Sequence, residues 1–174
     1  IFGKTNVPLY GDDIQTYNAL YGTTNNPWNV SRTPGGSSGG AAAALAAGLT
    51  GLELGSDIGG SIRTPAHFCG VYGHKPSYHI VPHEYQLAGI ADMDLVVVGP
   101  LARSAEDLEL SLEAIAGPNT QESAAWRLEL PLPRHENLRD YKIAAWLDGA
   151  RRREQALDVV MAADNGRDCR FGKT

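Results

Sequence analysis

The sequence has little cysteine and no excess of basic residues. Each shortage argues against certain kinds of site or binding partner. Cys69 and Cys169 are the only cysteines and lie a hundred residues apart. That spacing fits neither a disulfide framework nor a metal site, and it favours a reducing compartment. Lys and Arg total 15 against 20 Asp and Glu, which gives a formal net charge of −5. This acidity argues against nucleic acid or an anionic membrane surface as the main partner. We therefore expect a cytoplasmic protein.

Long apolar runs and metal-ligand spacings are missing as well. No run of about 18 apolar residues occurs, so the sequence predicts no transmembrane helix. The five histidines show no H-E-x-x-H or other ligand spacing, and we expect no metal site. The first residues, IFGKTN, lack both an initiator Met and the pattern of a signal peptide. The chain is therefore expected to begin inside a longer protein.

What the sequence does contain is glycine, with 20 residues, and an alternation of short predicted elements. The alanine-rich segment 41–49 and the segment 104–116 predict helices, the second with Ser104 as its N-cap. The apolar runs 52–54 and 95–98 predict buried strands. Alternating strands and helices predict an α/β layered fold.

Shorter signals predict further elements between these. Asp12 or Asp13 is a candidate N-cap for a short helix that runs through about residue 20. The short runs 71–72 and 78–81 predict strands.

Two loops rich in glycine and serine carry the clearest chemical signal, GGSSGG at 35–40 and GSDIGGS at 55–61. Glycine lets a backbone turn sharply and aim successive N–H groups at one point, which creates an anion-binding nest. In an acyl-transfer enzyme such a nest is an oxyanion hole. The run 58–61 places these donors beside a serine hydroxyl, and the first loop adds the hydroxyls of Ser37 and Ser38. A serine nucleophile needs a base to remove its proton.

Two other interpretations of these serines stay open at this point. They are ordinary loop serines in flexible glycine-rich linkers, or one of them is the centre of a G-x-S-x-G nucleophile elbow. The elbow fits GGSSGG with either Ser37 or Ser38 at its centre, but it requires a strand directly before it. The preceding segment VSRTPG ends in Pro34 and is a poor strand, which makes the elbow the weaker interpretation.

The longer pattern around both loops resembles a known family. PGGSSGGAAAALAAG followed by GSDIGGSIRTPAHFCGVYGHKP is similar to the amidase signature family of serine amide hydrolases, over about residues 1–147. The resemblance implies an α/β/α layered fold with a mixed central sheet, incomplete at both ends. Residues 1–148 would be the central part of the amidase signature domain. Residues 149–174 no longer resemble the family and would be a divergent tail of uncertain structure.

The resemblance also implies a Ser–cis-Ser–Lys catalytic triad. By the match, Ser61 is the nucleophile and Ser37, 24 residues earlier, is the bridging serine. The Gly36–Ser37 peptide is then expected in cis. The stretch that matches the oxyanion hole is Ile58, Gly59 and Gly60. The positions that match residues bracing the site are Ser38, Asp57 and Arg63. A plain structural ion pair is the favoured role for the last two.

This sequence departs from the family's pattern in two places. The family's catalytic lysine lies upstream of the GKTN stretch, so we expect it to be missing from this chain. Lys4 and Lys75 match other, non-catalytic positions. His79 stands where the family more often has glycine.

The expected reaction is hydrolysis of a carboxamide C–N bond through a serine acyl-enzyme, without metal or organic cofactor. Without the lysine segment this activity is impaired or absent in the chain. Because VPLYGDDIQTYNALYG differs from the usual sequence of the tRNA-linked subclass, a free-standing amidase acting on a small-molecule amide is favoured. The alternatives are a glutamine-dependent amidotransferase subunit that acts in a complex, and a non-catalytic fragment or pseudoenzyme. An incomplete core is also expected to expose apolar faces, through which the chain would associate or form homo-oligomers.

Overall fold

The computed structural model describes residues 3–82 and 95–141 of the chain. The chain divides into two compact units, Ile1–Glu129 and Leu130–Thr174. The elements of the first unit are, in order, the 3-10 helix η1 (Leu9–Gly11), β1 (Tyr17–Asn18), β2 (Gly22–Thr23), α1 (Gly39–Ala46), β3 (Leu52–Asp57), α2 (Arg63–Cys69), β4 (Tyr72–Gly73), β5 (Val97–Ala102), α3 (Ala105–Ile115) and the 3-10 helix η2 (Glu122–Ala124).

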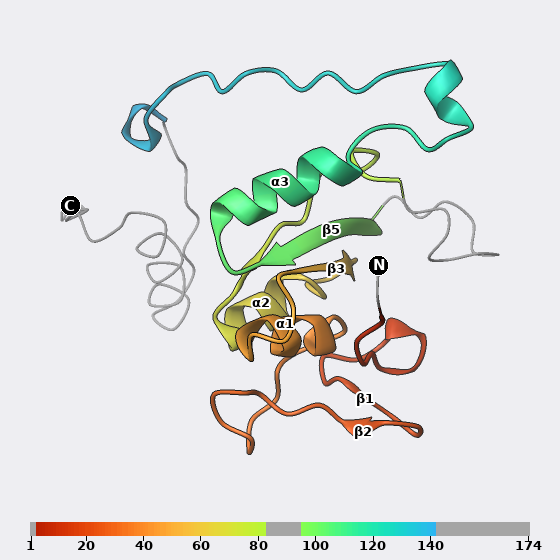
Figure 1. Cartoon of the computed structure of the whole chain (residues 1–174), viewed down its shortest axis with the longest axis vertical. Helices are drawn as coiled ribbons and strands as arrows, with labels where there is room; N and C mark the ends of the chain where they lie inside the picture. The colour runs from red at the N-terminus through yellow and green to blue at the C-terminus, as the bar shows by residue number, and fades with distance from the viewer. Residues whose placement is uncertain (1–2, 83–94, 142–174) are drawn as a thin grey trace, which may run out of the picture. The chain divides into compact units, whose positions relative to one another are not determined.

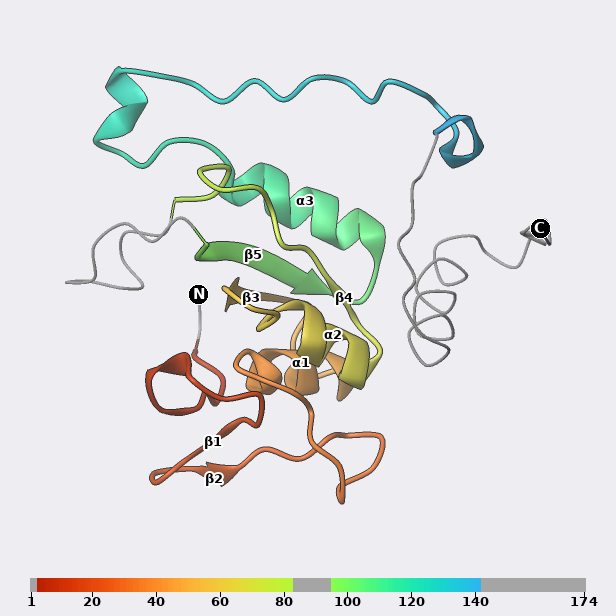
Figure 2. The ribbon, with the colours of Figure 1, turned by 180° about the vertical axis from the view of Figure 1, so that it is seen from behind.

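A three-stranded sheet forms the middle layer of the first unit, with the strand order β3-β5-β4. Its register places Leu52 opposite Ala102 and Asp57 opposite Val97. Helices α1 and α2 lie on one face of this sheet and α3 lies on the other (Figures 1 and 2). All six residues of β5 are buried, as expected for a central strand covered on both faces. The expected α/β/α layering is confirmed, and every strand pair in the described part of the chain is antiparallel.

The core lies between the sheet and the layer of α1 and α2. Helix α1 has the sequence GGAAAALA, and seven of its eight residues are buried because their small side chains allow close packing. The buried residues that form this core are Ala41, Ala42, Leu45, Ile62, Ala66, Cys69 and Leu101. Ile62 and Cys69 therefore link the second serine loop and α2 to the same apolar cluster as α1.

Most predicted elements of the first unit are confirmed. The alanine-rich helix is α1, the helix at 104–116 is α3, and the predicted strands at 52–54, 95–98 and 71–72 correspond to β3, β5 and β4. The burial expected for 52–54 is wrong, because Leu52 and Leu54 are 42% and 40% exposed. The Ser104 Oγ accepts the Asp107 N–H at 3.0 Å, so the expected N-cap is present.

The helix predicted from Asp12 or Asp13 to residue 20 is wrong. Asp13 Oδ1 accepts the N–H of Gln15 at 3.0 Å, which makes a local turn instead of a helix cap. The chain then enters the β1–β2 hairpin, where Asn18 Oδ1 accepts the backbone N–H groups of Leu20 and Tyr21. The same preference of Asp and Asn for local backbone bonds thus produced two turns here.

The strand predicted at 78–81 is also wrong, because this segment is a turn. The Ile80 N–H donates to Ser77 O at 3.2 Å. His79 lies within the turn with a φ of 65°, in the left-handed region that favours glycine. This conformation explains why glycine suits the position at which His79 departs from the family pattern.

The second unit is described over residues 130–141. Within that range the 3-10 helix η3 (Leu138–Asp140) is the only regular element. The rings of His135 and Tyr141 meet edge to face at 4.8 Å. The boundary expected at residue 148 lies outside the described residues. No helix among the described residues is both long and apolar enough to span a membrane.

We predict that Gly40→Ala destabilises the protein although it lies within a helix. An alanine normally gains about 1 kcal/mol over glycine in a helix. A Cβ at Gly40, however, would lie 2.2 Å from the Asn6 backbone oxygen, and overpacking of this kind costs about 1–3 kcal/mol. Urea unfolding followed by circular dichroism should show a lower midpoint for Gly40→Ala.

Gly51→Ala is the matched control for this prediction. No atom lies within 4 Å of a Cβ built at Gly51, so its free energy of unfolding should stay within about 0.5 kcal/mol of the wild type. A Gly40→Ala variant as stable as the Gly51→Ala variant would contradict the close approach of α1 to residue 6.

Candidate active site

The two glycine and serine loops lie next to each other and lead into α1 and α2. The first loop ends at Ser38, directly before α1, and the second joins β3 to α2 through Ser61. The Ser38 N–H donates to the Ser61 backbone oxygen at 3.1 Å. This bond couples the backbones of two loops that are more than 20 residues apart in the chain.

The first loop is buried, and glycine is required along it. Ser37 and Ser38 are each 5% exposed, and the peptide between Gly36 and Ser37 is cis, as the resemblance implied. A Cβ at Gly36 would lie 2.4 Å from the Asp13 backbone oxygen. A Cβ at Gly11 would lie 3.6 Å from Ser37 Oγ, so the η1 turn faces the Ser37 hydroxyl.

Ser38 connects the first loop to β3. Its Oγ donates to the Ser56 backbone oxygen at 3.5 Å and accepts the Ser56 N–H at 3.4 Å. A Cβ at Gly55 would lie 2.5 Å from Ser38 Oγ, so the strand has no side chain where the serine approaches. The side chain of Ser38 therefore joins the first loop to β3, and its role in bracing the site stays a prediction.

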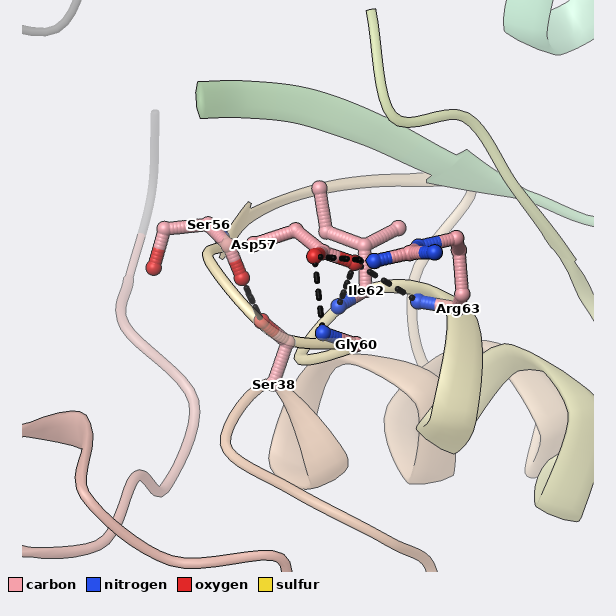
Figure 3. A network of polar contacts seen from close by, with 6 residues as sticks. All are labelled: Ser38, Ser56, Asp57, Gly60, Ile62 and Arg63. Carbon is pink, nitrogen blue, oxygen red and sulfur yellow. Dashed lines mark hydrogen bonds and ion pairs between the residues drawn. The ribbon is translucent and has the colours of Figure 1, made fainter. Parts of the chain in front are cut away.

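The carboxylate of Asp57 organises the second loop (Figure 3). It is fully buried at the end of β3. Its Oδ1 accepts the Gly60 N–H at 2.8 Å, and its Oδ2 accepts the N–H groups of Ile62 at 3.1 Å and Arg63 at 3.3 Å. The Arg63 guanidinium adds two bonds, Nη2 to Oδ1 at 2.9 Å and Nε to Oδ2 at 3.1 Å. The turn between Asp57 and Arg63 is thus wrapped around one carboxylate.

This network keeps Asp57 ionised. Burial by itself would raise the pKa of the Asp57 carboxyl, but the hydrogen bonds from Arg63, Ile62 and Gly60 together outweigh it and lower the pKa from 3.8 to about 2. The hydrogen bond to Asp57 in turn raises the pKa of Arg63. The arginine side chain is 55% exposed, so it closes the buried carboxylate off from solvent at the surface.

The network also decides which N–H groups of the loop are free. The Gly60 N–H, one of the predicted oxyanion donors, is directed at Asp57 Oδ1. The N–H groups of Ile58, Gly59 and Ser61 have no acceptor among the residues that the structure describes. Gly60 itself has a φ of 131° and a Cβ there would lie 2.8 Å from Thr64 Oγ1, so the turn requires glycine.

The lysines of the described segments do not reach this site. Lys4 is exposed and Lys75 is half-buried. Neither has a hydrogen bond or ion pair to Ser37 or Ser61 in residues 3–82 and 95–141. The same residues contain no group of three or more His, Cys, Asp or Glu side chains that could hold a metal ion.

Cys69 contacts the residue directly before the first serine loop. It is fully buried, its Sγ lies 3.5 Å from the Pro34 backbone oxygen, and burial raises its pKa to about 11. A buried thiol with a raised pKa is structural and not reactive. Trp28 Nε1 donates to the Cys69 backbone oxygen at 2.7 Å. Sequence reasoning missed Trp28 and the buried Thr16, because nothing in the local pattern shows contacts with residues far along the chain.

We predict that acid removes a stabilising contribution from Asp57. The folded-state pKa of about 2 lies below the ordinary value of 3.8. The contribution is therefore fully present above about pH 4 and is lost as the pH falls towards 2, and it amounts to about 2 kcal/mol. Urea unfolding at pH 7, 4 and 2 should show this loss in the wild type.

Asp57→Asn is the control for this effect, and its stability should change less between pH 4 and pH 2. At pH 7 it should be less stable than the wild type by about 2–4 kcal/mol, because its amide cannot accept all these bonds. Arg63→Lys should cost less, since this side chain is largely exposed. An equal pH dependence in the wild type and Asp57→Asn would contradict the assignment.

Comparison with known proteins agrees with this geometry. The Amidase family model matches residues 1–161. A glutamyl-tRNA(Gln) amidotransferase subunit of Sulfurisphaera tokodaii is 44% identical over 148 residues, which cover 85% of this chain and 31% of that protein. The corresponding protein of Cyanothece sp. PCC 7425 is 49% identical over 131 residues, 75% of this chain and 26% of that protein. The chain thus spans about a third or less of the curated relatives it matches.

Solved structures give the same result. A bacterial aryl acylamidase of the amidase signature enzymes matches with a TM-score of 0.65 and 38% identity, over 74% of this chain and 26% of that chain. The glutamyl-tRNA(Gln) amidotransferase subunit of Thermotoga maritima also matches with a TM-score of 0.65 and 38% identity, over 73% and 28% of the two chains. With the paired serine loops, the layered fold and the match over most of its length, the chain belongs to the amidase signature family.

Proposed function

We propose that the protein hydrolyses a carboxamide C–N bond through an acyl-enzyme formed on Ser61. The observation that carries this proposal is the turn around Asp57. It directs the Gly60 N–H to the carboxylate and leaves the N–H groups of Ile58, Gly59 and Ser61 without an acceptor among the described residues. These three donors precede or belong to the residue whose hydroxyl would attack, which is the arrangement that an oxyanion hole needs.

The proposed reaction passes one proton through the paired serines. Ser61 Oγ attacks the amide carbonyl carbon and gives its proton to Ser37 Oγ, while Ser37 gives its own proton to a neutral lysine. The carbonyl oxygen becomes an oxyanion, which the three N–H groups stabilise. The proton then returns to the leaving nitrogen, the C–N bond breaks, and water hydrolyses the acyl ester on Ser61. We propose the family's lysine, upstream of the GKTN stretch, as this base.

Residues that do not react themselves hold the two serine loops in position. Asp57 and Arg63 hold the turn, and Ser38 joins the first loop to β3 at Ser56. The loss of a single oxyanion donor typically lowers the rate by about 10²–10³, so small shifts of the turn are costly. The proposal needs neither a metal nor an organic cofactor. Two cysteines a hundred residues apart support the cytoplasm as its proposed location.

A second candidate is a glutamine-dependent amidotransferase subunit that works in a complex. The observation that favours it is the name of the two curated relatives described above, both of which are glutamyl-tRNA(Gln) amidotransferase subunits. The solved structures favour neither candidate, since they include an aryl acylamidase and a peptide amidase besides an amidotransferase subunit. The same paired serines would serve in both.

Association through apolar surface is part of the proposal. Large apolar side chains with an exposed fraction above two thirds are concentrated in the N-terminal part of the first unit: Leu9, Tyr10, Ile14, Leu20, Tyr21, Trp28, Val30 and Leu49. A contiguous exposed apolar patch typically contacts other protein. We propose that these side chains take part in association, either with further polypeptide or with a second copy.

We predict that a fluorophosphonate probe labels the longest native form of the protein at Ser61. The probe forms a covalent bond with an activated serine, and mass spectrometry of the digested protein locates the adduct. Ser61→Ala and Ser37→Ala should abolish or strongly reduce labelling, because one removes the nucleophile and the other the proton path.

Ser56→Ala is the matched control. Ser56 is also half-buried, at the end of β3, and only its backbone groups bond to Ser38. Its variant should label at the wild-type rate. Labelling at another serine, with Ser61 unmodified, would remove the proposed mechanism, and no labelling of any serine would favour the pseudoenzyme.

The two candidates predict different requirements for amide hydrolysis. A free-standing amidase should release ammonia or amine from small aryl and alkyl amides without any partner. An amidotransferase subunit should act on L-glutamine, and its rate should rise on adding the other subunits of a glutamyl-tRNA(Gln) amidotransferase. Assays for released ammonia and for released amine on the longest native form decide between them, with Ser61→Ala as the blank. Partner-independent turnover of an aryl amide would exclude the second candidate.

A further inference from the structure

Thr16 is fully buried, and its hydroxyl meets three backbone groups around the first serine loop. Thr16 Oγ1 lies 3.0 Å from Gly35 O, 3.3 Å from Ser37 O and 3.1 Å from Gly39 N. A hydroxyl can donate one proton and accept others. Thr16 therefore shares its one proton between the carbonyl oxygens of Gly35, which is the nearer, and Ser37, and it accepts the Gly39 N–H. These bonds tie the backbone on both sides of Ser37.

The Gly39 N–H is a group that α1 cannot satisfy by itself. The first N–H groups of an α-helix have no acceptor within the helix, and a serine at the N-cap usually supplies one. Ser38 occupies the N-cap of α1, but its side chain makes no capping bond and lies instead beside Ser56. Thr16, from 23 residues upstream, accepts the Gly39 N–H, which is the first of these donors. The side chain of Ser38 instead bonds to the backbone of Ser56 and so joins the first loop to β3.

Close packing holds the segment around Thr16 against the loop. A Cβ at Gly39 would lie 2.3 Å from Thr16 Oγ1, and a Cβ at Gly36 would lie 2.4 Å from the Asp13 backbone oxygen. Neither position can carry a side chain without a clash with this segment. The contact therefore fixes the loop by shape as well as by hydrogen bonds.

The backbone of Thr16 is itself hydrogen-bonded to the segment that follows the β1–β2 hairpin. The Thr24 N–H donates to the Thr16 backbone oxygen at 2.9 Å. Gln15 Nε2 donates to the Thr24 backbone oxygen at 3.2 Å. The backbone of Thr16 is thus held in place by hydrogen bonds. Its hydroxyl therefore has a fixed position against the first serine loop.

We propose that Thr16 is a positioning residue for the Ser37–Ser61 pair. It fixes the backbone from Gly35 to Gly39, and this loop is joined to Ser61 through the bond from the Ser38 N–H to Ser61 O. The position of the Ser37 hydroxyl relative to Ser61 then depends on a side chain that touches neither hydroxyl. This inference rests on the proposed function of the two serines.

Thr16→Val tests the inference, because it keeps the shape of the side chain and removes the hydroxyl. The maximal rate constant for phosphonylation of Ser61 by the fluorophosphonate, measured per folded molecule, should fall by about 10- to 100-fold. The probe concentration for half-maximal rate should stay unchanged, since the probe does not touch Thr16. Thr16→Ser keeps the hydroxyl and should restore most of the rate.

Ser123→Ala is the control, because it removes a hydroxyl that donates to the Thr120 backbone oxygen at 2.9 Å, in the 3-10 helix η2 and outside both serine loops. Its phosphonylation rate should equal that of the wild type. A merely structural role for Thr16 would lower the amount of folded protein and leave the rate per folded molecule unchanged. That result would overturn the proposal.

Amide hydrogen exchange of the wild type tests the bond from the Gly39 N–H to Thr16 without any activity or variant. The Gly39 N–H should exchange far more slowly than in an unstructured peptide, because its acceptor is a buried hydroxyl. Exchange of Gly39 at the unprotected rate would overturn the proposal even if Thr16→Val fails to fold. Absence of Ser61 labelling in the wild type would instead remove the proposed function, and a protected Gly39 N–H would still support the brace.

Discussion

The buried carboxylate of Asp57 is the constraint on which the site depends. Placing a charged group at 0% exposure carries a desolvation cost that only opposite charge and hydrogen bonds can offset. Here five bonds do so, two from the Arg63 guanidinium and three from backbone N–H groups. Those N–H groups belong to the second loop and the start of α2. The bonds that satisfy the carboxylate are therefore also the bonds that shape the turn. The position of Ser61 is a consequence of where this charge lies.

Close backbone approach is the second constraint, and it explains the glycine content of the two loops. Gly36, Gly39 and Gly40 face backbone or side-chain oxygens at distances that no Cβ could occupy. Gly55 meets the Ser38 hydroxyl in the same way. The glycines therefore bring layers of the fold into direct contact, so that hydroxyl groups reach backbone partners in other segments. Flexible linkers would not show this density of contacts, and the interpretation of the serines as linker residues is not supported.

Sequence reasoning predicted the features that depend on neighbouring residues. The Ser104 cap, the alanine-rich helix α1 and the apolar strands β3 and β5 each follow from a local pattern. It failed where a residue has a choice between local bonds, as at Asp13, whose carboxylate made a turn and not a helix cap. The cis peptide before Ser37 was expected only through the family resemblance, since no local pattern predicts it.

The sequence could not predict which backbone N–H groups of the second loop bond to Asp57 and which stay free. The run 58–61 presents four successive N–H groups, and nothing in its letters distinguishes Gly60 from its neighbours. The distinction arises because the Asp57 side chain reaches three residues ahead in the chain and accepts that one N–H at 2.8 Å. Thr16 is a similar case, because its partners lie 19 to 23 residues further along the chain.

These contacts also show how the proposed chemistry is divided within the family's site. The described residues hold the serine pair, the donor N–H groups and the charge that shapes them, all within one compact unit. Bonds among these residues fix the backbone of both loops, so the proposed nucleophile and oxyanion donors are placed by contacts within this unit. Under the proposed mechanism, a lysine beside Ser37 would meet serines whose backbone is already fixed, which is the condition under which orientation lowers a barrier most.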